Sequence, residues 1–120
     1  PVSDIIDIVW TAKPQTVLIE GANSRHAHEW AVLKELGVPA NKKLCPGVIE
    51  PQSNYIEHPD LIAQRLGQWA QVVDPERLIA GVDCGFSVHV GSTSIDPDVA
   101  FAKLASLSQG CEIASKRLFA

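Results

Sequence analysis

The sequence feature that most constrains the fold is an uninterrupted apolar run, residues 78–82 (LIAGV), which ends in Asp83, Cys84 and Gly85. A run of this length predicts a β-strand buried on both faces, as the strands of parallel sheets are. The strand then stops on a carboxylate and a thiol where a loop begins. Cys84 is therefore either a small core residue, the commoner fate of an unpaired cysteine, or a nucleophile or metal ligand.

A second apolar strand also ends in a carboxylate, which favours a functional role for Cys84 over a place in the core. Residues 16–19 (TVLI) predict a strand, and Glu20 follows it directly. In barrels of alternating strands and helices, functional side chains gather at the carboxyl ends of the strands, because the loops there converge on one mouth. Glu20 and Cys84 are therefore expected to approach one another at one end of a parallel sheet. By spacing alone, Glu20 could instead cap the helix that follows it.

The other segments predict helices and strands in alternation. Helices are expected at 5–12, 25–36, 59–73 and 97–118, and strands at 16–19, 43–48 and 78–82, with an irregularity of the middle strand near Gly47. Apolar spacing predicts the inward helix faces, namely Ile5, Val9 and Ala12; Trp30, Leu33 and Leu36; Ile62, Leu66, Trp69 and Val73; and Phe101, Leu104, Leu107, Cys111, Ala114 and Leu118.

This alternation predicts an α/β fold with parallel strands joined by right-handed crossovers. Three strands leave two open edges, and an eight-stranded barrel needs about 250 residues. We therefore expect residues 1–120 to be a single segment that forms the C-terminal three strand–helix units of a TIM (β/α)8 barrel. Its open edges and apolar sheet face would be covered by self-association or by the missing N-terminal part of the barrel.

Composition narrows the functional class. The net charge is −4, whereas a nucleic-acid surface needs clustered Lys and Arg, so no nucleic-acid partner is expected. No apolar stretch reaches the ~20 residues of a membrane span, and the first residues predict a helix and not a signal peptide. The three cysteines are far apart in the sequence, which predicts reduced thiols and a cytoplasmic protein. Cys45 and Cys111 are expected in the core.

Three motifs together resemble a known family. Glu20 after an apolar strand, Pro46-Gly47-Val48, and Asp83-Cys84-Gly85 occur in the order found in the C-terminal part of the catalytic barrel of cobalamin-independent methionine synthases. The segment 22–30 (ANSRHAHEW) is similar to a divergent branch of that family that includes epoxyalkane:coenzyme M transferases. The resemblance covers essentially the whole chain. It implies that Glu20 and Cys84 are zinc ligands.

The sequence departs from the family pattern at two places. The family's other two zinc ligands form a His-x-Cys pair that would lie upstream of residue 1, and two ligands do not complete the tetrahedral site that zinc prefers. Methionine synthases also carry a histidine, proposed as a proton donor, where this chain has Gln52. Because glutamine has no acidic proton to give, the resemblance predicts alkyl transfer to a thiol more firmly than it predicts homocysteine as the acceptor.

Several side chains near the expected barrel mouth are candidates for substrate binding. Arg25, with His26 and His28, could bind an anionic substrate tail, although a solvated first helical turn is an equal alternative. Asn54 and Tyr55 could line the mouth. Asp83 is expected to act beside the substrate by orienting the cysteine loop, or else to accept hydrogen bonds from turn amides. Of the other two histidines, His89 is a better site candidate than His58.

The resemblance therefore implies a zinc-dependent methyl or alkyl transferase whose partners are a small-molecule thiol and an alkyl donor. The 120 residues alone are expected to be inactive, because half of the ligand set is missing. An epoxyalkane:coenzyme M transferase is the alternative within the same class. The alternative from another class is a non-catalytic truncated fragment or interaction module.

Overall fold

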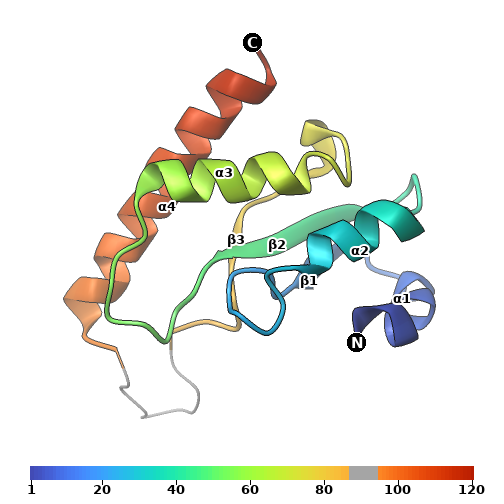
Figure 1. Cartoon of the computed structure of the whole chain (residues 1–120), viewed down its shortest axis with the longest axis horizontal. Helices are drawn as coiled ribbons and strands as arrows, with labels where there is room; N and C mark the ends of the chain where they lie inside the picture. The colour runs from blue at the N-terminus through green and yellow to red at the C-terminus, as the bar shows by residue number, and fades with distance from the viewer. Residues whose placement is uncertain (87–94) are drawn as a thin grey trace.

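The computed structural model describes residues 1–86 and 95–120. The elements in chain order are α1 (Val2–Trp10), β1 (Thr16–Ile19), α2 (Glu29–Leu36), β2 (Lys43–Ile49), α3 (Pro59–Trp69), the short 3-10 helix η1 (Pro75–Arg77), β3 (Gly81–Val82) and α4 (Pro97–Leu118) (Figure 1). No helix in these ranges is both long and apolar enough to cross a membrane.

The three strands form one parallel sheet in the order β1-β2-β3. Thr16 pairs with Lys43 and Ile19 with Pro46, and the register between β2 and β3 shifts between Gly47 and Ile49. Parallel pairing and the irregularity near Gly47 are both as predicted. Because the strands are parallel, their carboxyl ends lie at one edge of the sheet.

The strand that carries Asp83 and Cys84 is shorter than its apolar run predicts. Only Gly81 and Val82 are paired as β3, while Leu78 forms an isolated parallel bridge with Leu44. Ile79 is 46% exposed, so the expectation of burial on both faces is wrong for this residue. The reason is that the described part of the chain places no further strand beside β3 and nothing over that face.

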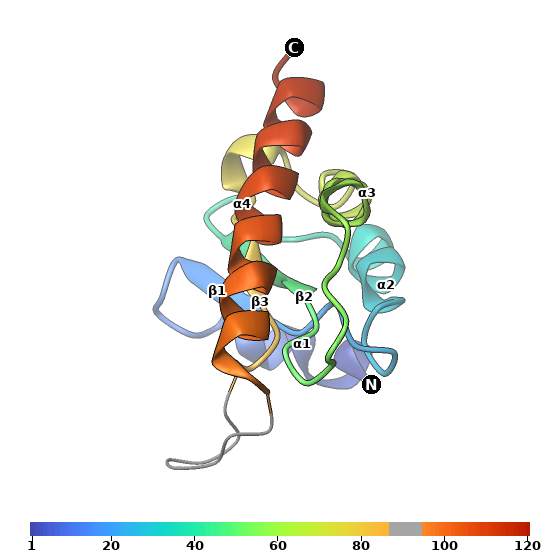
Figure 2. The same cartoon turned by 90° about the vertical axis from the view of Figure 1, so that its left-hand side faces the viewer.

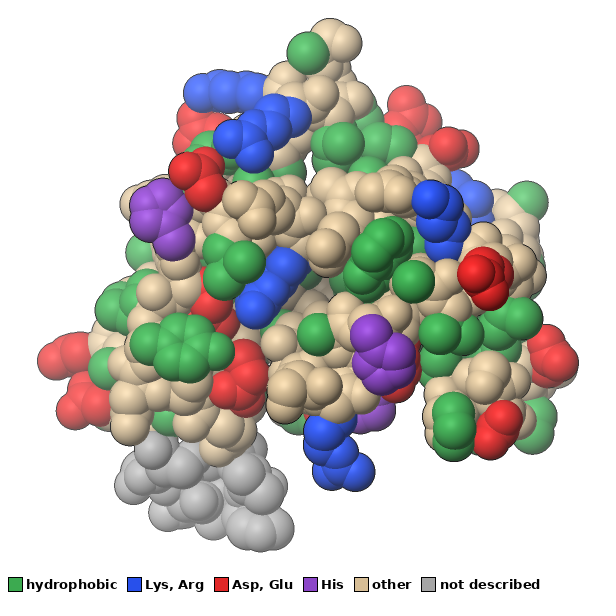
Figure 3. All heavy atoms as spheres, viewed as in Figure 1, with side chains coloured by type: hydrophobic (Ala, Val, Ile, Leu, Met, Phe, Trp, Pro, Cys, Tyr) green, Lys and Arg blue, Asp and Glu red, His purple; other side chains and the backbone are tan. Residues whose placement is uncertain are grey.

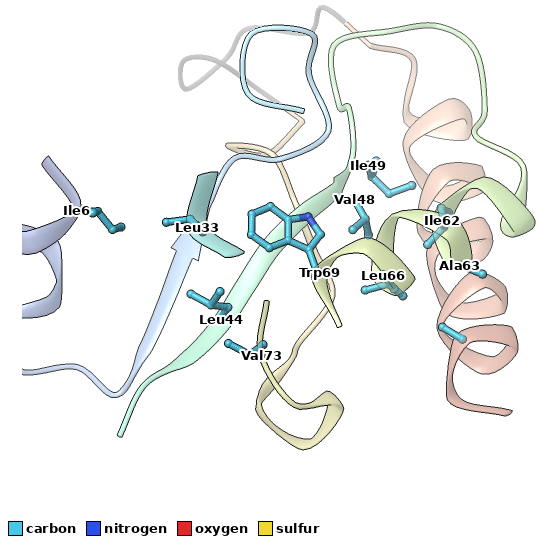
Figure 4. Close-up of a cluster of buried hydrophobic side chains, with 11 residues drawn as sticks. Ile6, Leu33, Leu44, Val48, Ile49, Ile62, Ala63, Leu66, Trp69 and Val73 are labelled. Atoms are coloured by element: carbon cyan, nitrogen blue, oxygen red, sulfur yellow. The ribbon is translucent and has the colours of Figure 1, made fainter. Parts of the chain in front are cut away.

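The core lies between the sheet and helices α2 and α3, which lie on the same side of the sheet in Figure 2. Trp69 is at its centre, between Leu33 of α2 and Leu44 and Val48 of β2 (Figure 4). Helix α3 ends at Trp69 and not at residue 73, but the predicted stripe is confirmed. Its members are at most 5% exposed, namely Ile62, Leu66 and Trp69 of α3 and Val73 after it. Burial of each such side chain stabilises the fold by roughly 1.5–3 kcal/mol.

The first two helices differ from the predictions in their bounds and faces. In α1 the buried residue is Ile6, whereas Ile5 is 55% exposed. Helix α2 begins at Glu29 and not at residue 25, because the chain between Asn23 and His28 forms hydrogen-bonded turns. Leu36, in the last turn of α2, is exposed and not inward as predicted.

The buried face of α4 is the predicted one only in part, since Ala114 is buried and Leu107, Cys111 and Leu118 are partly buried against the core. Its fully buried positions are Lys103, Ser106, Gly110 and Ala114, while Phe101 is 71% and Leu104 41% exposed. Gly110 sets the rotation of the helix, because a Cβ atom there would lie 2.5 Å from Ile62 Cγ2 and 3.0 Å from the Pro59 carbonyl oxygen. The glycine thus allows α3 and α4 to cross closely, and Phe101 and Leu104 turn outward.

A buried ion pair joins α4 to the loop that follows β2. Lys103 Nζ lies 2.8 Å from Glu57 Oε1, and both side chains are fully buried. Lys103 also donates to the Glu50 and Tyr55 carbonyl oxygens at 3.0 and 2.7 Å and to Ser53 Oγ at 3.0 Å. Glu57 Oε2 accepts from the Glu50 amide at 2.7 Å. The ammonium and the carboxylate thus fix the loop of residues 50–58 at the carboxyl end of β2.

We expect Lys103→Met to lower the free energy of unfolding by about 3–5 kcal/mol, because Glu57 would be left as a buried charge without its cation. Adding Glu57→Gln should restore part of this loss. Urea unfolding measures the free energy of unfolding of both variants. The matched control is Lys116→Met, because Lys116 pairs with Glu112 on the exposed face of the same helix. Its substitution should lower the free energy of unfolding by less than about 1 kcal/mol. Equal effects of the two lysine substitutions would contradict the assigned role.

Candidate active site

The carboxylate of Asp83 holds together the loops that follow β1 and β3. Its Oδ1 accepts from the Gly21 amide at 2.9 Å. Its Oδ2 accepts from the amides of Ala22 and Asn23 at 3.1 and 2.8 Å and from Asn23 Nδ2 at 2.9 Å. Asp83 is only 3% exposed, so these donors surround it. The two loops are therefore fixed relative to one another.

This arrangement matches the second of the two alternatives for Asp83, and substrate binding by Asp83 stays a prediction. Its buried carboxylate is occupied by the amides of the loop after β1, which is the alternative of hydrogen bonding to turn amides. Gly47 makes room for it, because a Cβ atom at that position would lie 1.7 Å from Asp83 Oδ1. The glycine of the Pro46-Gly47-Val48 motif is thus explained by packing, because the Asp83 side chain passes over β2 at this position.

Glu20 and Cys84 meet at the strand ends, as the sequence predicted. The Cys84 thiol donates a short hydrogen bond to Glu20 Oε1. Cys84 is exposed, and the Glu20 side chain is 36% exposed, so both face the solvent at the carboxyl edge of the sheet. Cys84 has a φ of 51°, a conformation that costs a non-glycine residue roughly 1–2 kcal/mol. The structure thus holds this thiol in a strained backbone position next to a carboxylate.

The contact with Glu20 is the main reason that the pKa of the Cys84 thiol lies above its ordinary value. The hydrogen bond to Glu20 favours the protonated thiol, and desolvation and the negative charges of Glu20 and Asp83 act in the same direction. Without a bound cation, Cys84 is therefore held as a thiol at neutral pH. Burial raises the pKa of Cys45 and Cys111, which are half-buried and not fully in the core as predicted.

His26 lies on the other side of Glu20, a contact that the sequence did not predict. Its Nε2 is 3.1 Å from Glu20 Oε2, and its Nδ1 is 2.6 Å from Glu29 Oε1. Cys84, Glu20, His26 and Glu29 therefore lie in a row. Hydrogen bonds join Cys84 to Glu20 and His26 to Glu29, and a close nitrogen–oxygen contact joins Glu20 to His26. The spacing of Glu29 three residues after His26 is the one signal in the sequence that could have indicated this pair.

The remaining histidines are placed differently. His28 is exposed and precedes α2 without a capping hydrogen bond. His58 caps α3, because its Nδ1 accepts from the Asp60 amide at 3.1 Å. His89, the other histidine considered for the site, lies outside the described residues.

A pocket of about 730 Å³ opens beside Glu20. Arg25 and Tyr55 line it, as expected for the mouth, whereas Asn54 is exposed and is not part of the lining. Arg65 of α3 also lines it and donates to the Val48 carbonyl oxygen at 2.9 Å. In Figure 3, histidine and Lys or Arg side chains surround the lower centre of the face, where the loop after β1 lies.

Gln52, at the position of the expected proton donor, is exposed after β2. Its Nε2 donates to the Gly85 carbonyl oxygen at 3.4 Å, which links this loop to the loop that carries Cys84. Within residues 1–86 and 95–120, no three side chains among His, Cys, Asp and Glu are arranged to hold a metal ion. Glu20 and Cys84 supply one oxygen and one sulfur donor side by side, which fits half of a tetrahedral zinc site.

Comparison with known proteins supports the relationship predicted from the sequence. The chain is 28% identical over 100 residues to a methionine synthase of Thermococcus kodakarensis, an alignment that covers 83% of this chain and 27% of that protein. It superposes with a TM-score of 0.80 and 24% identity on a B12-independent methionine synthase from Shewanella sp. W3-18-1, solved in complex with selenomethionine. The match covers 98% of this chain and 31% of the solved one. The fold is that of a TIM-barrel fragment.

The chain therefore spans less than a third of each of these methionine synthases. No protein-family model matches the sequence. Both named relatives are described as methionine synthases. The relation to epoxyalkane:coenzyme M transferases remains a prediction.

The contact between Glu20 and Cys84 predicts a change in thiol reactivity. Glu20→Gln should lower the pKa of Cys84, because an amide can donate to the thiolate and carries no negative charge. The alkylation of Cys84 by iodoacetamide at pH 8 should therefore become faster, since only the thiolate reacts. Peptide mass spectrometry over a pH series separates Cys84 from Cys45 and Cys111.

The matched control is Glu35→Gln, which removes an exposed carboxylate from α2 and should leave the pH profile of Cys84 unchanged. An unchanged profile in Glu20→Gln as well would show that the two side chains do not interact in solution.

Proposed function

We propose that the chain is part of a zinc-dependent enzyme that transfers a methyl or alkyl group to a thiol, in the manner of a methionine synthase. The observation that carries this proposal is the contact between Glu20 and Cys84 at the carboxyl ends of two parallel strands. Such edges hold the functional groups of TIM-barrel enzymes. The named relatives support methyl transfer; the zinc requirement is part of the proposal.

Glu20 and Cys84 would each supply one zinc ligand. The other two would come from a His-x-Cys pair upstream of residue 1. Bound zinc would supply the means to keep the acceptor thiol as a thiolate at neutral pH, since metal coordination displaces the thiol proton. Glu20 would bind through oxygen, which is a weaker ligand for this metal than thiolate, so it is the residue that could give up its place to the acceptor sulfur.

The protein groups would then orient the reactants. The acceptor sulfur forms a bond to the donor carbon, the bond from that carbon to its leaving nitrogen or oxygen breaks, and the leaving atom takes up a proton. Gln52 cannot supply this proton. The pocket beside Glu20, lined by Arg25 and Arg65, is the space in which the donor or acceptor would be held.

Homocysteine with a 5-methyltetrahydropteroyl-glutamate donor is the pair that we propose first. Gln52 in the place of the expected histidine favours testing a second pair, an epoxyalkane with coenzyme M as the thiol. The third possibility is that this chain is a non-catalytic fragment. A cytoplasmic location fits all three and is likewise proposed.

Zinc binding by two forms of the protein tests the proposal. The 120 residues alone should bind zinc weakly, since they supply half of the ligands, and a polypeptide that includes the preceding segment should bind one zinc tightly. In that longer polypeptide, Cys84→Ser should abolish tight binding and the transfer of alkyl groups to both candidate thiols. The exposed Ser3→Ala variant serves as the control.

Tight, stoichiometric zinc on the 120 residues alone would show that the ligands are misplaced. Absence of zinc-dependent transfer in the longer polypeptide would favour the non-catalytic fragment.

We also propose that the bare sheet face associates with other protein. Leu18 of β1 is 74% exposed, and Cys45, its register partner on β2, lines the same hollow as Gly81 of β3. Burial of such a face is worth roughly 25 cal/mol per Å². Its partner would be the remainder of the barrel or, when that is absent, a second copy of the chain.

Sedimentation velocity at micromolar concentration measures this association. The 120 residues should sediment as dimers or larger species, and Leu18→Lys should shift them towards monomer, because a charge at the centre of the contact is costly to bury. Ser3→Lys, at an exposed position of α1, should leave the distribution unchanged. A folded wild-type monomer would contradict the proposed association.

A further inference from the structure

His26 lies between two carboxylates that come from different elements. Its Nε2 faces Glu20 Oε2 at 3.1 Å, at the end of β1, and its Nδ1 faces Glu29 Oε1 at 2.6 Å, in the first turn of α2. The side chain of Glu29 is only 12% exposed, so this second contact is largely shielded from water. Each ring nitrogen of His26 therefore faces a carboxylate oxygen, and the one at Glu29 forms a hydrogen bond.

The backbone around His26 is fixed as well. The His26 and Ala27 amides donate to the Asn23 carbonyl oxygen at 3.1 and 2.9 Å, and the Glu29 amide donates to the His26 carbonyl oxygen at 3.0 Å. Asn23 is in turn bound through its amide and its side chain to the buried carboxylate of Asp83. The imidazole thus has a defined position relative to the strand ends.

The two carboxylate oxygens of Glu20 therefore have different neighbours. Oε2 faces His26 Nε2 at 3.1 Å, and Oε1 accepts from the Cys84 thiol. We propose that His26 is a positioning residue, which holds Glu20 so that Oε1 alone is presented to a metal ion shared with Cys84. The inference rests on the proposed zinc site and adds to it a residue that is not itself a ligand.

Two consequences distinguish this role from a purely structural one. A carboxylate held through one oxygen binds a metal through the other, whereas a freed carboxylate can turn and use both oxygens. Outer hydrogen-bond partners of metal ligands typically change metal affinity by about 10–100-fold when removed. His26→Ala should therefore alter both the affinity for the metal and the geometry around it.

The experiment uses the polypeptide that includes the segment preceding residue 1. Zinc affinity is measured by competition with a chelator, and the ligand geometry is measured from the absorption spectrum of the cobalt(II)-substituted protein. His26→Ala should weaken zinc binding by about 10–100-fold and shift the cobalt ligand-field bands. His26→Gln should recover part of the affinity, because its side-chain amide can donate to Glu20 Oε2.

His28→Ala is the matched control, since His28 is exposed two residues further along. It should match the wild-type protein in both affinity and spectrum. The inference is overturned if His26→Ala behaves like His28→Ala, or if His26→Gln binds zinc no better than His26→Ala, which would be expected of a direct ligand. If Cys84→Ser leaves zinc binding intact, the proposed zinc site fails instead, and the inference with it.

Discussion

The buried carboxylate of Asp83 is the interaction on which the strand-end site depends. It accepts hydrogen bonds from three consecutive backbone amides of the loop after β1, although it belongs to the loop after β3. Hydrogen bonds to a charged acceptor are stronger than neutral ones, and amides left without such an acceptor in a buried place are costly. Because Glu20 precedes these amides and Cys84 follows Asp83, the same interaction brings the two candidate ligands together.

A second buried charge has a similar role on the neighbouring loop. The ammonium group of Lys103, on α4, donates hydrogen bonds to carbonyl oxygens of the loop after β2 and so fixes the course of that loop. In Figure 1 this loop and the start of α4 lie at the same end of the molecule as the carboxyl end of β2. The buried charges of Asp83 and Lys103 thus fix the loops at the carboxyl edge of the sheet, which is where TIM barrels have their active sites.

The sequence predicted the structure best where apolar residues recur at helical spacing or where a polar residue directly follows an apolar strand. The stripe of α3 was predicted correctly because its apolar residues recur at helical spacing and because Trp69 has one face of the sheet to pack on. The meeting of Glu20 and Cys84 followed from parallel strands alone. Two roles stayed open for Asp83 because its hydrogen-bond donors lie in a loop about 60 residues away in the sequence, which no local pattern reports.

Hydropathy predicted the later part of the buried face of α4 but not its first turns. Lys103 is buried because Glu57 and several carbonyl oxygens compensate its charge, whereas Phe101 is exposed, against the usual preference of both residue types. His26 was considered only for binding an anionic substrate. Its contact with Glu20 was missed because that contact crosses a turn, which has no helical or strand period.

The central claim is that Cys84 and Glu20 are ligands of one metal ion, and zinc-edge X-ray absorption spectroscopy of the zinc-loaded polypeptide tests it most directly. The account predicts sulfur scatterers at about 2.3 Å together with oxygen or nitrogen at about 2.0–2.2 Å. A Cys84→Ser sample reconstituted with excess zinc should show one sulfur fewer. An identical sulfur shell in the wild-type and Cys84→Ser samples would contradict the account.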